Sequence, residues 1–297
     1  MIKDTLGVKV FRVFNFIFLS FAAFLCVAPF LNLLAVSLSA GHYVAAGRVG
    51  FIPIGLNFES YNFVFTSVRF LQSFSTSVIR VLLGVAINII VVLLCAYPLS
   101  KSNEEFKQRK IYSWFFMFAM LFVPSLIPHF LVVMNLRLLD SIWALVLPPA
   151  LPIFSVIVML NFFRNLPKEL EESAALDGAG HFRTLLQIFI PLSKPSIATI
   201  VLFSAVFHWN SWFDGIIFMN RPENYPLQSF LQTILINPAT LMRDMQGDPN
   251  LIAMLMLISN HTLRAAQLFI ATIPILLLYP FLQKYFITGL VLGSVKE

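Results

Sequence analysis

Residues 11–38 read FRVFNFIFLSFAAFLCVAPFLNLLAVSL, a run in which nearly every side chain is apolar. About 20 consecutive apolar residues are enough for a helix to cross the hydrocarbon core of a bilayer, so this run predicts a membrane-spanning helix. Lys3, Lys9 and Arg12 lie before or at its start, which raises the alternative of a secretory signal peptide. The run is about twice as long as the core of such a signal and equally long runs follow it, so we interpret it as a retained first span.

The composition of the whole chain supports this class. Hydrophobic residues make up 59% of the 297 and charged residues only 11%, whereas a soluble domain is nearer one quarter charged. Both cysteines, Cys26 and Cys95, lie inside apolar runs, which favours packing over a disulfide or a metal site. The net charge of +6 comes from basic residues scattered between the runs, so we expect topology rather than nucleic acid to explain it.

Six apolar runs together predict an all-α, polytopic membrane protein with one transmembrane domain over residues 1–297. The expected spans are 11–38, 74–98, 111–133, 141–163, 195–219 and 266–288. Proline removes a backbone donor, so we expect kinked or broken helices, packed against protein, near five prolines: Pro124, Pro128, Pro148, Pro149 and Pro152.

The basic residues between the spans predict the orientation. With the N-terminus inside, thirteen Lys and Arg lie in inner segments: Lys3, Lys9, Arg12, Lys101, Lys107, Arg109, Lys110, Arg164, Lys168, Arg183, Lys194, Lys284 and Lys296. Six lie in outer segments: Arg48, Arg69, Arg137, Arg221, Arg243 and Arg264. The positive-inside rule therefore predicts that both termini are cytoplasmic. The outer segments 39–73 and 220–265 are long enough to have structure of their own or to bind something.

The longest polar stretch on the inner side is residues 164–195, RNLPKELEESAALDGAGHFRTLLQIFIPLSKP. Pro167 suits a helix start, and carboxylates in the first turn complement the positive helix end: Glu169, Glu171 and Glu172. Gly178 then interrupts the helix, because glycine accepts backbone angles that other residues avoid. We expect two short helices at an angle on the cytoplasmic face. An ordinary amphipathic connector is the alternative.

This stretch resembles the "EAA" loop of binding-protein-dependent importer permeases. The family pattern is Glu-Ala-Ala, three residues, Gly, nine residues, Ile, one residue and Leu-Pro. The matching residues here are Glu172, Ser173, Ala174, Gly178, Ile188, Ile190 and Pro191. Ser173 replaces the first Ala and Ile190 replaces Leu, and both substitutes are small or apolar enough to fit. Asp177 and Ala179 complete the Asp-Gly-Ala that is usual among the carbohydrate members.

The resemblance covers nearly the whole chain. Residues 207–213, FHWNSWF, resemble the Trp-Asn-x-Trp-Phe segment of the fifth span in sugar permeases, and residues 225–228, YPLQ, resemble the outer loop that follows it. The tail from Phe286 to Lys296 is similar to the family's Gly-x-x-x-Gly-Ala-Val-Lys end, with Ser294 in place of Ala. This is the pattern of the second, shorter permease of a maltose-type pair, in a branch that includes permeases for pectin- and alginate-derived oligosaccharides.

Several expectations follow from the resemblance alone. The chain would hydrolyse nothing and hold no cofactor, while ATP and Mg would be bound by a separate cytoplasmic ATPase dimer. A second permease subunit would complete a heterodimer in the bacterial plasma (inner) membrane, and an extracellular solute-binding protein would deliver an oligosaccharide for alternating access. The expected ATPase-coupling residues are Glu171, Glu172, Ala174, Asp177, Gly178 and Ala179, and the terminal tail would add a second contact.

Polar and aromatic residues in or near the spans are candidates for the substrate pathway. A charge at bilayer depth costs about 2.5–3.5 kcal/mol, so such residues usually face a cavity or a partner. The candidates are Trp209, Asn210, Trp212, His208, Arg80 and His129. Arg80, His129 and His208 would offer cations to an acidic, uronate-type sugar. The alternatives are that Trp212 is an interfacial anchor and that His129 is bonded to a neighbouring helix.

Other functional classes fit less well. The Gly-x-Ser-Gly tetrad of six-helix intramembrane serine proteases, a His-Glu-x-x-His metal motif and a Gly-rich phosphate loop are all missing from the sequence. A secondary transporter or channel would need inverted repeats or broken helices at matched positions and no loop of this kind. A permease for amino acids, phosphate or metals remains an alternative, although Asp177-Gly178-Ala179 favours sugars.

Overall fold

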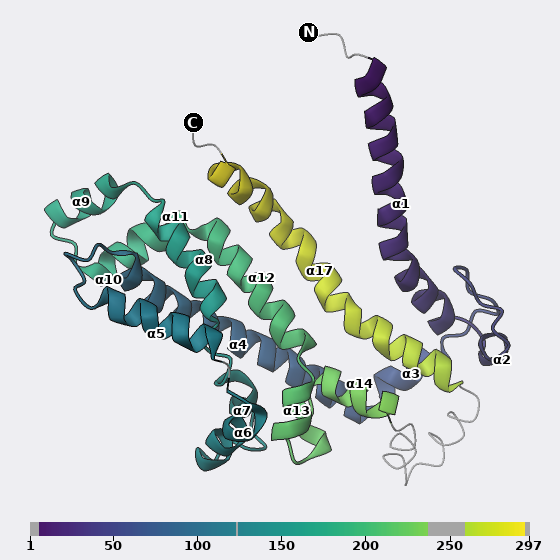
Figure 1. Ribbon diagram of the computed structural model, residues 1–297. Coiled ribbons are helices and arrows are strands. Elements are labelled where there is room, and N and C mark those ends of the chain that lie inside the picture. Colours follow the sequence, from purple (N-terminus) through teal and green to yellow (C-terminus); the bar gives the residue numbers. More distant parts are fainter. Residues whose placement is uncertain (1–5, 123, 237–258, 295–297) are drawn as a thin grey trace. The chain divides into compact units, whose positions relative to one another are not determined.

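The computed structural model describes residues 6–122, 124–236 and 259–294, and the regular elements in these ranges are helices joined by loops (Figure 1). Within them, one isolated bridge between Ser39 and Leu56 is the only β-type pairing. The expected all-α class is therefore confirmed. The chain divides into two compact units: Met1–Leu71 with Thr233–Ile273, and Gln72–Gln232 with Pro274–Glu297.

The first unit contains α1 (Leu6–Ser37), α2 (Gly41–Ala45), α3 (Glu59–Thr66) and the first part of α17 (Asn260–Ser294). The Ser37 hydroxyl lies 2.7 Å from that of Tyr61, which joins α1 to α3. Ser60 donates to Thr262 at 3.1 Å in the interior, which joins α3 to α17. Most apolar side chains of α1 are exposed, as lipid-facing side chains would be.

The second unit is built around α4 (Val68–Ser100), a long helix whose first residues belong to the first unit. It packs with α8 (Ile153–Arg164), η1 (Leu185–Phe189) and α12 (Lys194–Asn210). Their shared core contains Val92, Ala96, Met159, Phe163, Phe189 and Ile200, all almost fully buried. This core fixes α4 beside the segments that carry most of the candidate functional residues.

Prolines interrupt the helices on one side of this unit, as expected. α5 (Arg109–Leu121) and α6 (Leu126–Asn135) meet at 115°, with Pro124 in the gap. α7 (Ile142–Val146) is separated from α8 by a segment that contains Pro148, Pro149 and Pro152. A second cluster, around Val133, Leu145 and Phe218, joins α6 and α7 to α13 (Phe213–Phe218).

Short helices connect α8 to α12 and follow α13. The first connection contains α9 (Lys168–Leu176), α10 (His181–Thr184), the π-helix η1 and α11 (Ile190–Leu192). The segment His181–Leu192 meets α12 at 82°. After α13 come η2 (Pro222–Asn224) and α14 (Leu227–Ile236).

Three described helices are long and apolar enough to cross a bilayer: Gly7–Ser37, Val68–Ser100 and Asn260–Leu278. Counting each of two bent pairs as one span, α5 with α6 and His181–Leu192 with α12, raises the number to five. The expectation of one continuous helix over 195–219 is wrong, because α12 ends at Asn210 and α13 begins at Phe213. Much of the outer segment 220–265 lies outside the described residues.

Candidate functional site

The break between α12 and α13 borders a cleft of about 680 Å³. Its walls are mainly apolar and include several aromatic side chains, of which Phe207, Trp212 and Phe213 are between 41% and 52% exposed. The polar residues on its lining are His129, Asn210, Ser211 and Asp214. Aromatic faces beside a few hydrogen-bonding groups suit a ligand with apolar faces and hydroxyl edges, as in a sugar.

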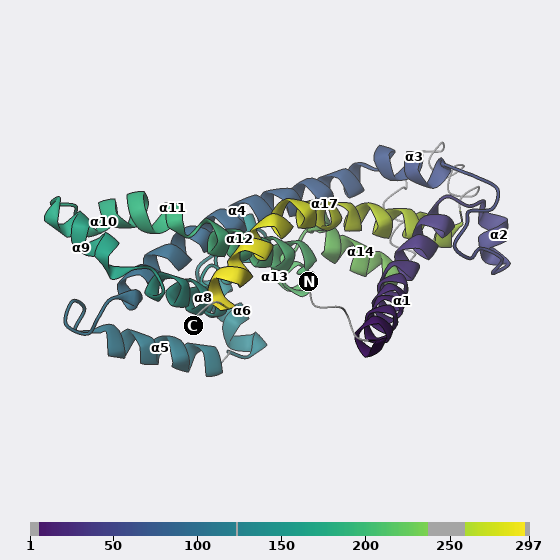
Figure 2. The same ribbon diagram turned by 90° about the horizontal axis from the view of Figure 1, so that it is seen from above.

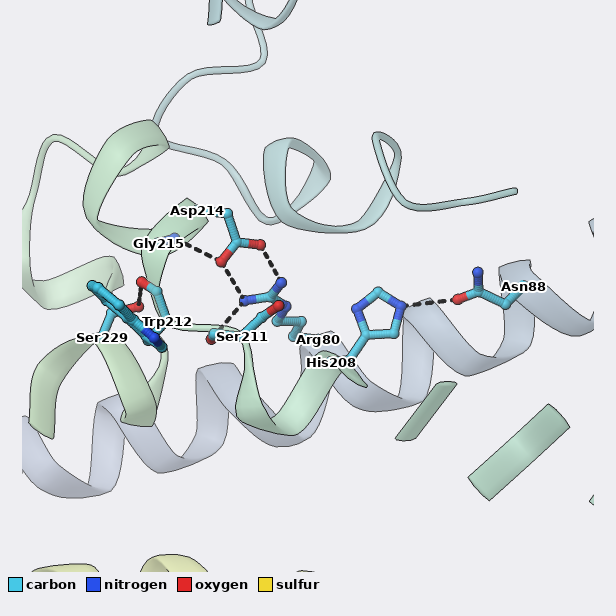
Figure 3. A network of polar contacts seen from close by, with 8 residues as sticks. All are labelled: Arg80, Asn88, His208, Ser211, Trp212, Asp214, Gly215 and Ser229. Carbon is cyan, nitrogen blue, oxygen red and sulfur yellow. Dashed lines mark hydrogen bonds and ion pairs between the residues drawn. The ribbon is translucent and has the colours of Figure 1, made fainter. Parts of the chain in front are cut away.

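Arg80, on α4, holds the broken helix in place (Figure 3). Its Nη1 donates to the Ser211 carbonyl at 3.3 Å and to Asp214 Oδ1 at 3.2 Å, and its Nη2 forms an ion pair with Asp214 Oδ2. The Arg80 side chain has no exposed surface. A break in a helix inside a membrane protein leaves backbone groups without helical hydrogen-bond partners. Arg80 supplies a donor for one of them, the Ser211 carbonyl.

One further hydroxyl bonds the break itself, and a second bonds the start of α14, the helix that carries the first. Ser229, on α14, donates to the Trp212 carbonyl at 2.7 Å (Figure 3). Ser77, on α4, accepts from the Leu227 backbone N–H at 2.7 Å. Gly215 lies against Ser229, and a Cβ there would also come within 2.9 Å of Pro226 Cδ. The two-residue break is thus a fixed element rather than a loose connection.

A second polar link joins α4 to α12 and to the proline segment before α8. His208 Nε2 lies 2.9 Å from Asn88 Oδ1, and Asn88 donates to the carbonyls of Pro149 and Ala150 at 2.8 and 3.2 Å. Because the amide nitrogen of Asn88 is the donor to those carbonyls, its oxygen is the acceptor for His208. We therefore assign the His208 proton to Nε2.

Gly84 lies directly against this link, since a Cβ at Gly84 would overlap the His208 ring. We expect Gly84→Ala to displace the ring, break its hydrogen bond to Asn88 and lower stability by about 1–3 kcal/mol, the usual cost of overpacking. Thermal unfolding in detergent measures this. Gly7→Ala, in α1 with nothing near the added methyl group, is the control and should not lower the melting temperature. Equal melting temperatures for Gly84→Ala and the unchanged protein would contradict the assignment.

The structure separates the six candidate pathway residues into two groups. His129, Asn210 and Trp212 line the cleft. Trp209 is 4% exposed and packs edge-on against Phe74 at 5.7 Å between ring centroids. His208 and Arg80 are buried in the contacts described above. The charge of Arg80, one of the three cations expected for an acidic sugar, is paired with Asp214.

Asp140 joins the turn after α6 to the loop after α13. Its Oδ1 accepts from the backbone N–H groups of Asn220 and Arg221, both at 3.2 Å, and from the Asn224 amide at 3.0 Å. The hydrogen bond from Asn224, aided by the two backbone donors, holds the pKa of Asp140 below its ordinary value. These contacts connect two segments near the cleft and involve no residue that the sequence had indicated as a candidate for function.

The loop predicted to couple to an ATPase begins with α9 and turns at Gly178. The Gly178 N–H donates to the Ala175 carbonyl at 3.0 Å, and the Ala179 N–H donates to the Ala174 carbonyl at 2.9 Å. Together with φ +75° at Gly178, these two bonds form a Schellman motif, which ends a helix with a residue in the left-handed region. The expected interruption at Asp177-Gly178 is therefore present.

Side chains of this loop point in different directions. Glu172 and Asp177 are exposed, and Leu176 and Phe182 are 90% and 73% exposed. Ala174 is only 6% exposed and packs inward. Glu171 forms an ion pair with Lys101, at the end of α4, so it has a partner within its own chain. The sequence had indicated Lys101 only as one of the inner basic residues, and it had not indicated Phe182. The expected contact of the terminal tail falls on side chains outside the described residues.

Comparisons with known proteins cover almost the full length of the chain. The polygalacturonan/rhamnogalacturonan transport system permease protein YtcP of Bacillus subtilis (strain 168) is 37% identical over 97% of this chain and 99% of the relative. Protein LplC of the same organism is 36% identical over 99% of this chain and 97% of the relative. No protein-family model matches the sequence.

Solved structures show the same architecture. A bacterial ABC transporter involved in the import of the acidic polysaccharide alginate has a chain that is 28% identical, with a TM-score of 0.86 over 96% of this chain and all of that one. A bacterial alginate ABC transporter in complex with an alginate pentasaccharide-bound periplasmic protein is 17% identical with a TM-score of 0.58, and supports the fold alone. The chain belongs to the permease family of ATP-binding-cassette sugar importers.

Proposed function

We propose that this chain is one of two permease subunits of an importer that takes up an oligosaccharide delivered by an extracellular binding protein. Support comes from the names of its full-length relatives, which include permeases for polygalacturonan or rhamnogalacturonan and for arabino- and galactooligosaccharides. The geometric observation that carries the proposal is the end of α9, where Leu176 is 90% exposed beside the Gly178 turn. Phe182, on the other side of the turn, is 73% exposed, and several exposed apolar side chains on one short polar loop are typical of a surface that a partner covers.

The partner that fits this surface is a cytoplasmic ATPase dimer. Leu176 and Phe182 would supply apolar anchors, and Glu172 and Asp177 would meet basic groups around them. Gly178 and Ala179 shape the turn, while Ala174 packs inward and seats the helix. In this proposal ATP and Mg bind to the ATPase, and this chain carries out no hydrolysis.

The proposed topology has six spans in one permease domain. The broken pairs α5–α6, α7–α8 and α12–α13 each count as one span, in addition to α1, α4 and α17. The thirteen inner and six outer basic residues support cytoplasmic termini in a bacterial plasma membrane. The loop containing α9 and α10 then lies on the side where ATP is available.

The proposed substrate is an oligosaccharide of the acidic, uronate type, by analogy with the polygalacturonan/rhamnogalacturonan permease and the alginate importer. The cleft favours contact with sugar ring faces through Trp212, Phe207 and Phe213, with hydrogen bonds from Asn210. His129 lines the cleft and is its candidate cation, since Arg80 is paired with Asp214. Uptake of neutral oligosaccharides alone, with no competition from uronate oligomers, would exclude the acidic class.

Purification of this chain from its native membrane in mild detergent, followed by mass spectrometry, tests the assembly. We expect a second permease, an ATPase with a phosphate loop and a solute-binding protein to be recovered together, and the ligand of the binding protein would name the sugar. Recovery of the chain alone, or as a homo-oligomer without an ATPase, would refute the proposal and favour a channel or a secondary transporter.

The ATPase contact itself makes a sharper prediction. A buried apolar anchor at an interface is worth about 2 kcal/mol or more, so Leu176→Asp should weaken ATPase binding at least about thirtyfold. Titration of the detergent-solubilised permease pair with the purified ATPase measures this. Ile52→Asp is the matched control, because Ile52 is 76% exposed in a predicted outer segment. Equal ATPase affinity for the two variants would contradict the docking surface.

A further inference from the structure

Lys101 is a buried lysine at the end of α4. Its side chain is only 6% exposed, whereas lysine is almost never this buried unless it is paired. Its ammonium forms an ion pair with Glu171, on α9, and Glu171 is itself 29% exposed. The loop has two arms, α9 before the Gly178 turn and the segment from α10 to η1 after it. The first arm, α9, is thus attached to the end of α4 by this ion pair.

The same ammonium also contacts the second arm of the loop. It lies 4.1 Å from the ring centroid of Tyr97, on α4, and 4.6 Å from that of Phe189, at the end of η1. Cations are attracted to aromatic faces at this range. The two rings pack edge-to-face at 5.0 Å. Lys101 therefore holds both arms, α9 and η1, against the same helix end.

The other part of α4 is fastened to the cleft. Arg80 bonds the Ser211 carbonyl and Asp214 across the break between α12 and α13. At about 1.5 Å per residue, Arg80 and Lys101 are roughly 30 Å apart along α4. α4 runs as one helix from Val68 to Ser100, with its single proline, Pro98, in the last turn, and both views show it passing from the α9–α10 end of the second unit to α13 (Figure 1 and Figure 2).

The chain also connects the loop to the break by a second route, through α11 and α12. That route bends by 82° where His181–Leu192 meets α12. Pro191 and Pro195 lie on either side of the bend, and proline removes backbone hydrogen bonds from a helix. A displacement of the loop is transmitted more directly along the continuous helix than through this angle.

We propose that α4 transmits motion from the coupling loop to the cleft, with Lys101 as the fastening at one end and Arg80 as the fastening at the other. This inference rests on the proposed function and assigns Lys101 and Glu171 as positioning residues. When the ATPase moves α9, the Lys101–Glu171 pair carries α4 with it, and Arg80 carries the break that borders the cleft. Without the pair, the loop moves and the cleft does not follow.

The complete transporter in proteoliposomes, with its partner permease, ATPase and sugar-loaded binding protein, provides the test. The quantity measured is the ATP hydrolysed per sugar transported. For Lys101→Met and for Glu171→Gln we expect it to rise about fivefold or more, the lower end of typical coupling between sites. The exchange Lys101→Glu with Glu171→Lys should recover part of the loss, because it restores an ion pair. Lys168→Met, which removes an exposed lysine from the same short helix as Glu171, should have no effect.

Glu171→Gln decides the result if Lys101→Met does not assemble, because it removes the ion pair and leaves the buried lysine stem in place. Wild-type stoichiometry for assembled Glu171→Gln would overturn the inference while leaving the importer assignment intact. A rise in both single variants that the exchange does not reduce would also count against it, because a general packing defect would explain that pattern. Failure of the unchanged chain to bind any ATPase would instead refute the proposed function.

Discussion

Replacement of Arg80 by alanine is expected to destabilise the permease more than any other single charge deletion described above. The substitution leaves Asp214 with an unpaired charge and the Ser211 carbonyl without its donor. Arg80 is fully buried but Asp214 is 24% exposed, so the loss should fall somewhat below about 3–5 kcal/mol, the cost of removing one partner of a fully buried ion pair. Thermal unfolding in detergent should show a large fall in melting temperature, and uptake should be lost because the break no longer has a fixed position.

Two further variants test whether the loss of stability comes from breaking the Arg80–Asp214 ion pair. Arg80→Met combined with Asp214→Asn removes both charges while keeping similar volumes, so it should regain much of the stability lost in Arg80→Ala. Arg221→Ala deletes the same charge from an ion pair with Asp140 in which Arg221 is 74% exposed, and it should cost less than about 1 kcal/mol. Similar melting temperatures for Arg80→Ala and Arg221→Ala would show that the buried pair does not hold the break.

Replacement of Gly178 by valine is expected to abolish sugar uptake while ATP hydrolysis continues. Gly178 has φ +75°, and a non-glycine residue in the left-handed region costs about 1–2 kcal/mol, more when it is β-branched. Nothing lies within 4 Å of a Cβ at this position, so the effect acts through the backbone and not through a clash. The turn would open and redirect the end of α9.

Gly180 supplies a matched control two residues away. It also has open space around an added methyl group, but its φ is −74°, which any residue adopts. Gly180→Val should therefore retain uptake, and Gly178→Asn should lose less than Gly178→Val because asparagine tolerates the left-handed region. Normal uptake by Gly178→Val would rule out the turn as a coupling element.

Features that depend on neighbouring residues were predictable from the sequence. The apolar runs identified the helical class, and Pro124, Pro148 and Pro149 lie where helices are interrupted, because proline acts on its own turn. The Gly178 turn was also predicted, since its conformation depends on one residue type and two local hydrogen bonds. The motif around Glu172 indicated the family that the full-length relatives show.

The break at Ser211–Trp212 was not predictable in this way. No proline or glycine lies between Asn210 and Phe213, and the polar residues around it, such as Asn210 and Ser211, occur inside helices as well. The break persists because groups from other elements satisfy its backbone, namely Arg80 from α4 and Ser229 from α14. A helical pattern read in one segment contains no information about such partners.

The sequence by itself determined the helical membrane class, the proline interruptions and the glycine turn, because each is a local property of a few adjacent residues. Only the tertiary structure decided which charged side chains form ion pairs with each other. Arg80 meets Asp214 across 134 positions of sequence, and Lys101 meets Glu171 across 70. Long-range pairing depends on how helices pack, and burial makes a charge stable only where packing brings a partner to it. For this reason the sequence indicated Arg80 as a candidate for the substrate pathway but not its contacts with Asp214 and the break beside the cleft.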